Sequence, residues 1–426
     1  MHPKALLDGC AELVRLSLMF DHPADAVVSR FFREQRSYGP RERATLTDTV
    51  YNVLRKKQFF EYLARSGSGA KERRMAILGF AGPVDFPKSA LSDTEKQWLD
   101  ACLQVKDTEL MDRHRHNLPD WLVVPLKEQL GDEGFWQLAG ALEQPAGLDL
   151  RVNVLNAKRE QVQPELAKAG LPTQPTPYSP WGLRVAGKPS LNKLDAFQRG
   201  AIEVQDEGSQ LLALLADAKR GEMVVDFCAG AGGKTLALGA SMRNTGRLYA
   251  FDTSAHRLEA LKPRLARSGL SNVHPVAIAH ERDDRIKRLA GKIDRVLVDA
   301  PCSGLGTLRR SPDLKWRQTP QTVEELAKLQ AAILQSAARL LKPGGRLVYA
   351  TCSLLPQENE AVADAFSAAH ASDFTPLDVG EVLDGLKQGE SVAKLCRGGE
   401  SGHLYLRLWP HLHGTDGFFA AIWQKK

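Results

Sequence analysis

Residues 223–235 read MVVDFCAGAGGKT, and this stretch decides the fold class. Its first half is an apolar run, which predicts a buried strand over 223–229. Three glycines then predict a tight turn, and a helix is predicted to begin near residue 233. A strand that turns through glycines into a helix is the unit from which parallel α/β sheets are built, and its turn suits an electron-rich ligand.

The chain beyond this stretch repeats the alternation of strand and helix. Strands are predicted at 223–229, 247–252, 273–278, 294–300 and 346–353, and helices near 233–242, 254–268, 321–341 and 357–369. Such apolar strands between amphipathic helices indicate a parallel sheet that is covered on both faces. Two more strands, 404–410 and 418–424, are expected to form an antiparallel pair. The sequence therefore predicts an α/β, Rossmann-like domain over residues 219–426.

The N-terminal third has a different pattern. Apolar residues recur every three or four positions, as at Leu6, Leu13 and Leu16, so residues 1–144 are predicted to form an all-helical domain. Residues 145–218 contain a strand, a helix and a proline-rich segment that ends in a strand. This pattern predicts a small α/β module, of the RRM-like kind, between the two larger domains.

Composition limits the class of protein. The net charge is +6; residues 1–150 hold 20 Lys/Arg against 22 Asp/Glu, and the remainder holds 37 against 29. The basic surplus of the C-terminal two thirds fits an anionic partner such as RNA, and a slightly basic soluble protein explains it equally well. No apolar run approaches the roughly 18 residues of a membrane span. The six cysteines contain no CxxC pair, so we expect reduced thiols, no metal site and a cytoplasmic location.

The glycine turn can be compared with three kinds of cofactor site. A phosphate-binding P-loop would need a glycine where Cys228 stands, and a dinucleotide fingerprint would need one at Thr235. The third kind binds S-adenosyl-L-methionine: Asp226 and the turn would hold its amino-acid end, and Asp252 would accept its ribose hydroxyls. Nicotinamide dinucleotides and S-adenosyl-L-methionine both contain a ribose that a carboxylate can bind, so Asp252 alone does not identify the cofactor. Residues further along the chain are needed to distinguish the two.

Two later strands each end in a thiol. Residues 296–307 read VLVDAPCSGLGT and place Asp299 and Cys302 just beyond one strand, and YATCS places Cys352 just beyond the next. The carboxyl ends of parallel strands form the ligand side of an open sheet. One cysteine would be read as a small buried hydrophobic residue. Two, each in a turn at the same edge, favour a function in which both sulfur atoms act together.

One reaction needs such a pair of thiols. Carbon 5 of cytosine is too weak a nucleophile to attack a sulfonium methyl group directly. A thiolate that adds to carbon 6 makes carbon 5 reactive, and an acid near ring nitrogen 3 assists. Loss of the carbon 5 proton afterwards lets the thiolate leave, and a second thiol can help this adduct to resolve.

The motifs DFCAGAGGKT, FD, LVDAPCSGLGT and YATCS…QENE, behind a helical N-terminal part, resemble the RsmB/Nop/Sun family of RNA cytosine-5 methyltransferases. The bacterial branch with a NusB-like RNA-binding domain is the most similar. The resemblance implies that Cys352 attacks carbon 6, that Cys302 aids product release and that Asp299 contacts both cofactor and base. It also implies a set of cofactor-binding residues: Asp226, Cys228, Ala229, Gly230, Ala231, Gly232, Gly233, Lys234, Asp252, Arg257, Asp283 and Asp299.

The chain departs from the family pattern at two places. The family's loop usually reads Cys-Ala-Ala-Pro-Gly-Gly-Lys, and here Gly230 and Ala231 replace Ala-Pro, which leaves the turn less rigid. The acidic residue on the adenine side stands in the segment AHERDD. We assign that role to Asp283, with Glu281 as the alternative, and both could equally be solvated charges.

Weaker features surround these motifs. Segments at 150–153 and 198–210 resemble family segments that border the cleft, and residues 205–209 could equally be a helix cap. Beyond Cys302, the segment 305–316 carries basic and aromatic residues that suit RNA, or it is a solvated loop. The residues concerned are Arg151, Asn153, Gln205, Asp206, Ser209, Arg309, Arg310, Lys315 and Trp316.

Together these features predict an enzyme that methylates carbon 5 of a cytosine in RNA through a covalent cysteine adduct. Small-subunit ribosomal RNA is the expected substrate, and the protein is expected to work as a monomer. The alternatives are the same chemistry on transfer RNA and a non-catalytic RNA-binding assembly factor. A nicotinamide-dependent oxidoreductase would leave both thiols without a role.

Overall fold

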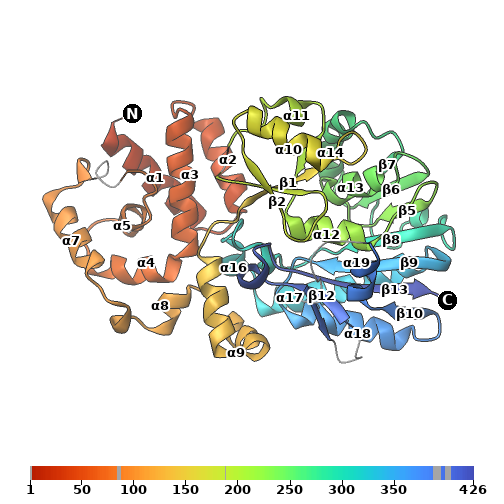
Figure 1. The fold of residues 1–426 in the computed structure, drawn as a ribbon. Coiled ribbons are helices and arrows are strands. Elements are labelled where there is room, and N and C mark those ends of the chain that lie inside the picture. The colour runs from red at the N-terminus through yellow and green to blue at the C-terminus, as the bar shows by residue number, and fades with distance from the viewer. Residues whose placement is uncertain (1, 84–87, 188, 387–394, 399–403) are drawn as a thin grey trace. The chain divides into compact units, whose positions relative to one another are not determined.

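The computed structural model describes residues 2–83, 88–187, 189–386, 395–398 and 404–426 (Figure 1). These residues form two compact units. The helical unit comprises Met1–Pro145 together with Thr307–Pro320, and the α/β unit comprises Ala146–Gly306 together with Gln321–Lys426. The chain therefore leaves the α/β unit four residues after Cys302 and returns to it at Gln321.

The first helices of the helical unit pack around a shared apolar core. Leu7, Leu13, Leu46, Val50 and Met75 are fully buried there, which confirms the apolar spacing read from the sequence. All regular secondary structure described in this unit is helical, whereas its likeness to NusB stays a prediction. Its α-helices are α1 (Pro3–Ser17), α2 (Ala24–Glu34), α3 (Pro40–Arg55), α4 (Lys57–Leu63), α5 (Lys71–Leu78), α7 (Asp93–Leu103), α8 (Asp112–His116), α9 (Asp120–Leu142) and α16 (Leu314–Arg317).

The segment 307–320 fits into this unit by capping α3. The last carbonyl groups of a helix lack partners within it, and here side chains of the segment supply donors. Trp316 Nε1 donates to Leu54 O, and Lys315 Nζ donates to Arg55 O, both at 2.8 Å. Lys315 is 2% exposed. Its ammonium group is thus engaged inside the helical unit, so the suggestion that it binds RNA phosphates is wrong.

The α/β unit begins with a small antiparallel sheet in the order β2-β3-β1-β4. Leu150, Val152 and Leu183 on its strands pack against Val162 and Leu166 of the helix α10. The three-residue strands β2 and β4 were not predicted, because they are too short to show alternation. The elements are β1 (Leu148–Val152), α10 (Arg159–Lys168), β2 (Thr173–Pro175), β3 (Gly182–Val185), α11 (Asp195–Gln198), β4 (Ile202–Val204) and α12 (Glu207–Leu215).

The large sheet has the order β11-β12-β13-β9-β8-β5-β6-β7, with β10 paired to β13. Strands β9, β8, β5, β6 and β7 are parallel, and β13 runs antiparallel between β9 and β12. The α/β fold class and the antiparallel pair are confirmed. The strands are β5 (Met223–Asp226), β6 (Arg247–Asp252), β7 (Val273–Ala277), β8 (Ile293–Asp299), β9 (Leu341–Thr351), β10 (Phe374–Leu377), β11 (Cys396–Gly398), β12 (Leu404–Leu408) and β13 (Phe418–Lys425).

Helices cover both faces of this sheet (Figure 1). Successive residues of a strand point to opposite faces, so Tyr349 of β9 packs with one layer and Val348 with the other. The first layer contains α17 and α18, and the second contains α12, α13, α14 and α19. The helices not yet given are α13 (Gly233–Ser241), α14 (Ala255–Ser268), α15 (Asp284–Lys287), α17 (Pro320–Ala338), α18 (Glu360–Ala369), α19 (Val379–Gly385) and α20 (Pro410–His413).

Candidate active site

The two predicted thiols lie together at the carboxyl edge of the sheet. Cys302 follows β8, Cys352 follows β9, and these strands are parallel neighbours. The two Sγ atoms are 3.3 Å apart, and the backbone N–H of Cys352 donates to Cys302 Sγ at 3.3 Å. Both side chains are half-buried, so the pair is not sealed inside the protein. The predicted convergence of the sulfur atoms is confirmed.

The fully buried carboxylate of Glu358 joins the two thiol loops. It accepts from the backbone N–H of Ser303 at 2.8 Å and from the Ser303 hydroxyl at 2.5 Å. It also accepts from the Ser353 hydroxyl and from Gln330 Nε2, the latter at 3.0 Å. Ser303 and Ser353 each follow a thiol directly, so one carboxylate fixes both loops. No role was predicted for Glu358, although it lies in the quoted QENE motif.

Two glycines bring a third loop against the thiol loops. The N–H of Gly306 donates to Cys352 O, and the N–H of Gly417 donates to Gly306 O, both at 2.8 Å. A Cβ atom on Gly306 would come within 2.1 Å of Gly417 O, so only glycine fits there. Asn359 Nδ2 adds a bond of 3.1 Å to Ser353 O. The backbone around Cys352 is therefore held from several sides.

A charged pair lies beside the thiols. Lys234 Nζ donates to Asp299 Oδ2 at 2.7 Å, and the lysine side chain is 11% exposed. Burial by itself would lower the pKa of Lys234, but Asp299, Cys352 and Asp226 outweigh it, so the pKa lies above its ordinary value. Lys234 thus keeps its positive charge at neutral pH and favours negative charge on its neighbours.

The two thiols differ in their surroundings. The hydrogen bond with Cys352 and burial raise the pKa of the Cys302 thiol well above its ordinary value, and the charge of Glu358 adds to this. Cys302 is therefore a neutral thiol at neutral pH. The protonated Cys302 can thus serve as the hydrogen-bond donor to the sulfur of Cys352.

The glycine turn is closed by Asp252. Its Oδ2 accepts from the N–H of Gly230 and its Oδ1 from the N–H of Ser254, at 2.8 and 2.7 Å. Gly230 and Gly232 have φ angles of 56° and 84°, which side-chain-bearing residues rarely adopt. A Cβ on Gly232 would meet Leu261 at 2.1 Å, whereas a Cβ on Gly230 would meet nothing within 4 Å. The turn is therefore packed on one side and open on the other.

Asp226 has the features of a ligand-binding carboxylate. It is fully buried, and burial raises its pKa to about 7. Its Oδ2 accepts from the Thr235 hydroxyl at 2.6 Å, but its Oδ1 has no hydrogen-bond partner among the described residues. An unpaired buried oxygen beside an open glycine turn fits a polar cofactor whose ammonium group can donate to it. The residues present thus fit S-adenosylmethionine.

Residues of the small sheet reach this turn, as the segments at 150–153 and 198–210 suggested. Arg151 Nη1 donates to Gly233 O at 2.8 Å and to Gln205 Oε1 at 2.9 Å. Burial lowers the pKa of Arg151 to about 10, so the guanidinium remains charged at neutral pH. Gln205 Nε2 in turn donates to Ser209 Oγ at 3.1 Å, and Asp206 caps α12. Asn153 binds Ser268 O instead.

The remaining predicted cofactor residues lie in less specific surroundings. Cys228 is half-buried, and burial followed by the charges of Asp299 and Asp226 raises its pKa well above the ordinary value. Ala229 continues the backbone pairing with Phe251. Arg257 is exposed in the first turn of α14.

Asp283 forms the N-cap of α15. Its carboxylate accepts from the N–H groups of Ala279 and Arg285, both at 2.9 Å, and these bonds lower its pKa. Glu281 pairs with Arg282 at 3.4 Å. Both residues thus have partners in their own loop, and the adenine contact stays a prediction.

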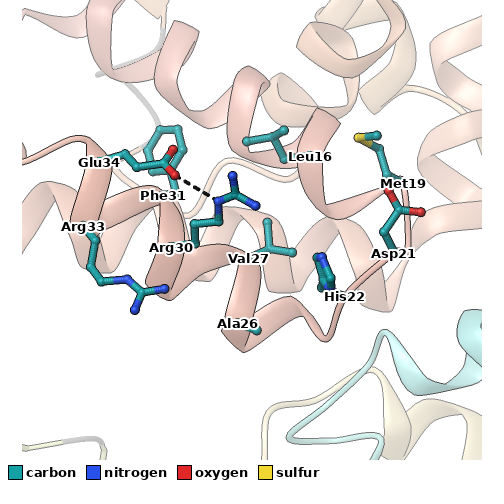
Figure 2. A pocket seen from close by; sticks show the side chains of 10 residues that line it. All are labelled: Leu16, Met19, Asp21, His22, Ala26, Val27, Arg30, Phe31, Arg33 and Glu34. Atoms are coloured by element: carbon teal, nitrogen blue, oxygen red, sulfur yellow. Dashed lines mark hydrogen bonds and ion pairs between the residues drawn. The ribbon is translucent and has the colours of Figure 1, made fainter.

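The helical unit contains a separate cavity of about 440 Å³, shown in Figure 2. Leu16, Val27 and Phe31 are among its apolar lining residues. Arg30 pairs there with Glu34 at 2.9 Å, so one cation of the basic stretch 30–43 belongs to an ion pair on its own helix. None of the predicted catalytic or cofactor residues lines this cavity.

A Rossmann-like sheet with Asp226 and Asp252 at its glycine turn, and with two thiols at neighbouring strand ends, fits the class of S-adenosylmethionine-dependent methyltransferases. The sequence models of two families agree. One, described as 16S rRNA methyltransferase RsmB/F, matches residues 213–424, and another, described as an RsmF/B-like ferredoxin-like domain, matches residues 118–192. The chain belongs to the RsmB/F family and is an RNA methyltransferase.

Relatives of known name support this assignment. A protein of Synechocystis named probable ribosomal RNA small subunit methyltransferase B is 37% identical over 312 residues, which cover 73% of this chain and 67% of the relative. A protein of the same name from Bacillus subtilis is 31% identical over 352 residues, or 82% of this chain and 76% of the relative. Both pairs of chains align over most of their length.

Solved structures show the same architecture. The crystal structure of PH0851 has a TM-score of 0.79 and 28% identity, and the match covers 100% of this chain and 99% of that one. NSun6 from Pyrococcus horikoshii, solved with the methyl-donor analogue SFG, has a TM-score of 0.61 and 23% identity over 72% of this chain and 98% of that one. The match to the methyltransferase family model confirms the predicted cofactor. No described helix is both long and apolar enough to cross a membrane.

Proposed function

We propose that this enzyme methylates carbon 5 of a cytosine in small-subunit ribosomal RNA, through a covalent bond between Cys352 and the base. The observation that carries the proposal is the distance of 3.3 Å between the two sulfur atoms at the sheet edge. The names of the relatives support the choice of RNA, and the enzyme would then act in the cytoplasm as a monomer.

The first step is the addition of Cys352 to carbon 6. The thiolate forms the sulfur–carbon bond, and the electrons of the carbon 5–carbon 6 double bond make carbon 5 nucleophilic. Lys234 supports the thiolate, since Cys352 is among the charges that raise the pKa of this lysine. We assign to Asp299, held by Lys234, the contact with ring nitrogen 3.

The methyl donor would be held by Asp226, Asp252 and the turn 228–234, and when bound it supplies an electrophilic methyl carbon. Methylated carbon 5 must then lose its proton, so that the double bond re-forms and Cys352 leaves as a thiolate. Cys302 would accept this proton as a thiolate, after its own thiol proton has passed to solvent. Its hydrogen bond with Cys352 is the largest cause of its raised pKa, and that cause disappears once the Cys352 sulfur is bonded to carbon.

The two thiols can be tested separately with labelled S-adenosylmethionine and unmodified ribosomal RNA, with transfer RNA as a second substrate. Cys352→Ala should lower methylation by about a thousandfold or more, since the nucleophile is lost. Cys302→Ala should accumulate a protein–RNA adduct that survives denaturing gel electrophoresis.

Cys396→Ala serves as the matched control, because this half-buried thiol lies in β11. It should methylate RNA at the rate of the unchanged protein. Full activity of Cys352→Ala would refute the assigned roles, and labelling of transfer RNA alone would refute the substrate.

A further inference from the structure

The glycine turn of this chain is held from outside by two arginines. Gly230 and Gly232 both have positive φ angles, and Ala231 stands between them. Glycine has more conformational freedom than any other residue, so such a turn keeps one shape only if other groups fix it. In this turn, hydrogen bonds from side chains outside it fix the carbonyl groups of Ala231 and Gly233.

Arg264 of α14 fixes the first of these carbonyls. Its Nη1 donates to Ala231 O at 2.6 Å, and its Nε and Nη2 donate to Glu203 Oε2 at 3.3 and 3.1 Å. The planar guanidinium group thus donates three hydrogen bonds to two fixed oxygen atoms, and these bonds set the orientation of the guanidinium. Arg151 fixes the second carbonyl, that of Gly233.

Glu203 is itself firmly placed. It lies on β4, its side chain is 5% exposed, and its other oxygen accepts from Arg267, whose guanidinium lies 4.2 Å from the Phe197 ring centre. In the small sheet Glu203 is the register partner of Arg151. The antiparallel strands β1 and β4 therefore supply two groups: Glu203, which orients Arg264, and Arg151, which binds the carbonyl of Gly233.

We propose that Arg264, oriented by Glu203, is a positioning residue for S-adenosylmethionine. It gives the turn the rigidity that a proline at position 231 would provide, and it makes the small sheet a determinant of cofactor affinity. The inference rests on the proposed cofactor site at 228–234. Because Arg264 binds a backbone carbonyl and not the reacting atoms, it should act on cofactor binding and leave the methyl-transfer step nearly unchanged.

The test is calorimetric titration of S-adenosylmethionine into the full chain without RNA. Arg264→Met should weaken binding by about tenfold, the usual effect of losing one charge-assisted hydrogen bond. Glu203→Gln should weaken it in the same direction. With saturating cofactor, kcat of both variants should stay within about twofold of the unchanged enzyme.

Lys262→Met is the matched control. This lysine lies on the same helix, but its ammonium group pairs with Glu259 and is exposed to solvent. Its removal should leave cofactor affinity unchanged.

A rescue experiment separates rigidity of the turn from general damage. Among the described residues the N–H of Ala231 has no hydrogen-bond partner, so Ala231→Pro loses no bond there. A proline fixes φ and reduces the freedom of the unbound turn. In the Ala231→Pro background, Arg264→Met should therefore weaken binding clearly less than it does alone.

Three outcomes would contradict the inference, and they are distinguishable. If the unchanged chain binds the cofactor but Arg264→Met and Glu203→Gln bind it equally well, Arg264 has no positioning role. If Asp226→Asn and Asp252→Asn also leave binding unchanged, the proposed cofactor site itself is wrong. Equal losses from Arg264→Met with and without proline would show that the arginine does not act through the shape of the turn.

Discussion

Glu358 shows how one side chain can set the geometry of two thiol groups. Four donors converge on its two oxygens, and two of the donor residues are the neighbours of Cys302 and Cys352. A carboxylate accepts at both oxygens, so it satisfies all four donors at once. The separation of the thiols therefore depends on a residue that touches neither sulfur.

We expect Glu358→Gln to damage both stability and catalysis. The amide nitrogen of glutamine is a donor and would face the donors of Ser303 or Ser353, which leaves buried groups unpaired at about 1–3 kcal/mol each. Thermal unfolding should show a lower midpoint, and kcat should fall more than the affinity for cofactor.

The exposed neighbour provides the control: Gln357→Ala should leave both quantities unchanged. A Glu358→Gln enzyme of normal kcat would show that the thiol spacing does not depend on this clamp.

The segment 307–320 stabilises the C-terminal end of α3. It caps α3 with Trp316 and with the ammonium group of Lys315, whose pKa burial lowers to about 7. A lysine in the unfolded chain has a pKa near 10.4. The folded state thus binds fewer protons between these two values, and the cost of burying this lysine is largest below pH 7 and falls as the pH rises.

Lys315→Met should therefore raise the free energy of unfolding at pH 6, by about 1–4 kcal/mol once the lost bond to Arg55 O is subtracted. The gain should shrink toward pH 10, where the lysine is neutral in both states. Denaturant unfolding at the two pH values measures this difference. A variant less stable than the unchanged protein at pH 6 would contradict the buried ammonium group.

How much of the molecule could be predicted also differs between elements. Long apolar strands such as β8 and β9 were found because burial on both faces leaves a continuous apolar run. β10 was missed, since its four residues include Pro376, and proline argues against a strand. The thiols, Asp226 and Asp252 were found because each side chain stands at a strand end.

The groups that hold these residues could not be found in the same way. Ser303 and Glu358 are 55 positions apart, and Glu203 and Arg264 are 61 apart, so only the folded chain brings them together. The capping of α3 by Lys315 and Trp316 uses backbone carbonyls as acceptors. Every residue has such a carbonyl, so the sequence carries no mark of this contact.

The helical unit consists of two chain segments that are far apart in the sequence. A fragment 146–426 would keep residues 307–320 but lose the helices against which they pack. We expect trypsin to cut this fragment rapidly after Lys315 and Arg317, whereas in the full chain the first of these is buried. Mass spectrometry of timed digests checks this. Equal resistance of fragment and full chain would show that the segment is ordered without the helical unit.

The position of β13 has a consequence for how the protein is made. In chain order β13 follows every other described strand, yet it lies in the interior of the sheet, between β9 and β12. While a ribosome synthesises the chain, β9 must wait with an unpaired edge until residues 418–425 have emerged. Such an edge recruits strands from other nascent chains. Newly made copies should therefore depend on chaperones until β13 has paired with β9, and the thiol site can form only after this pairing.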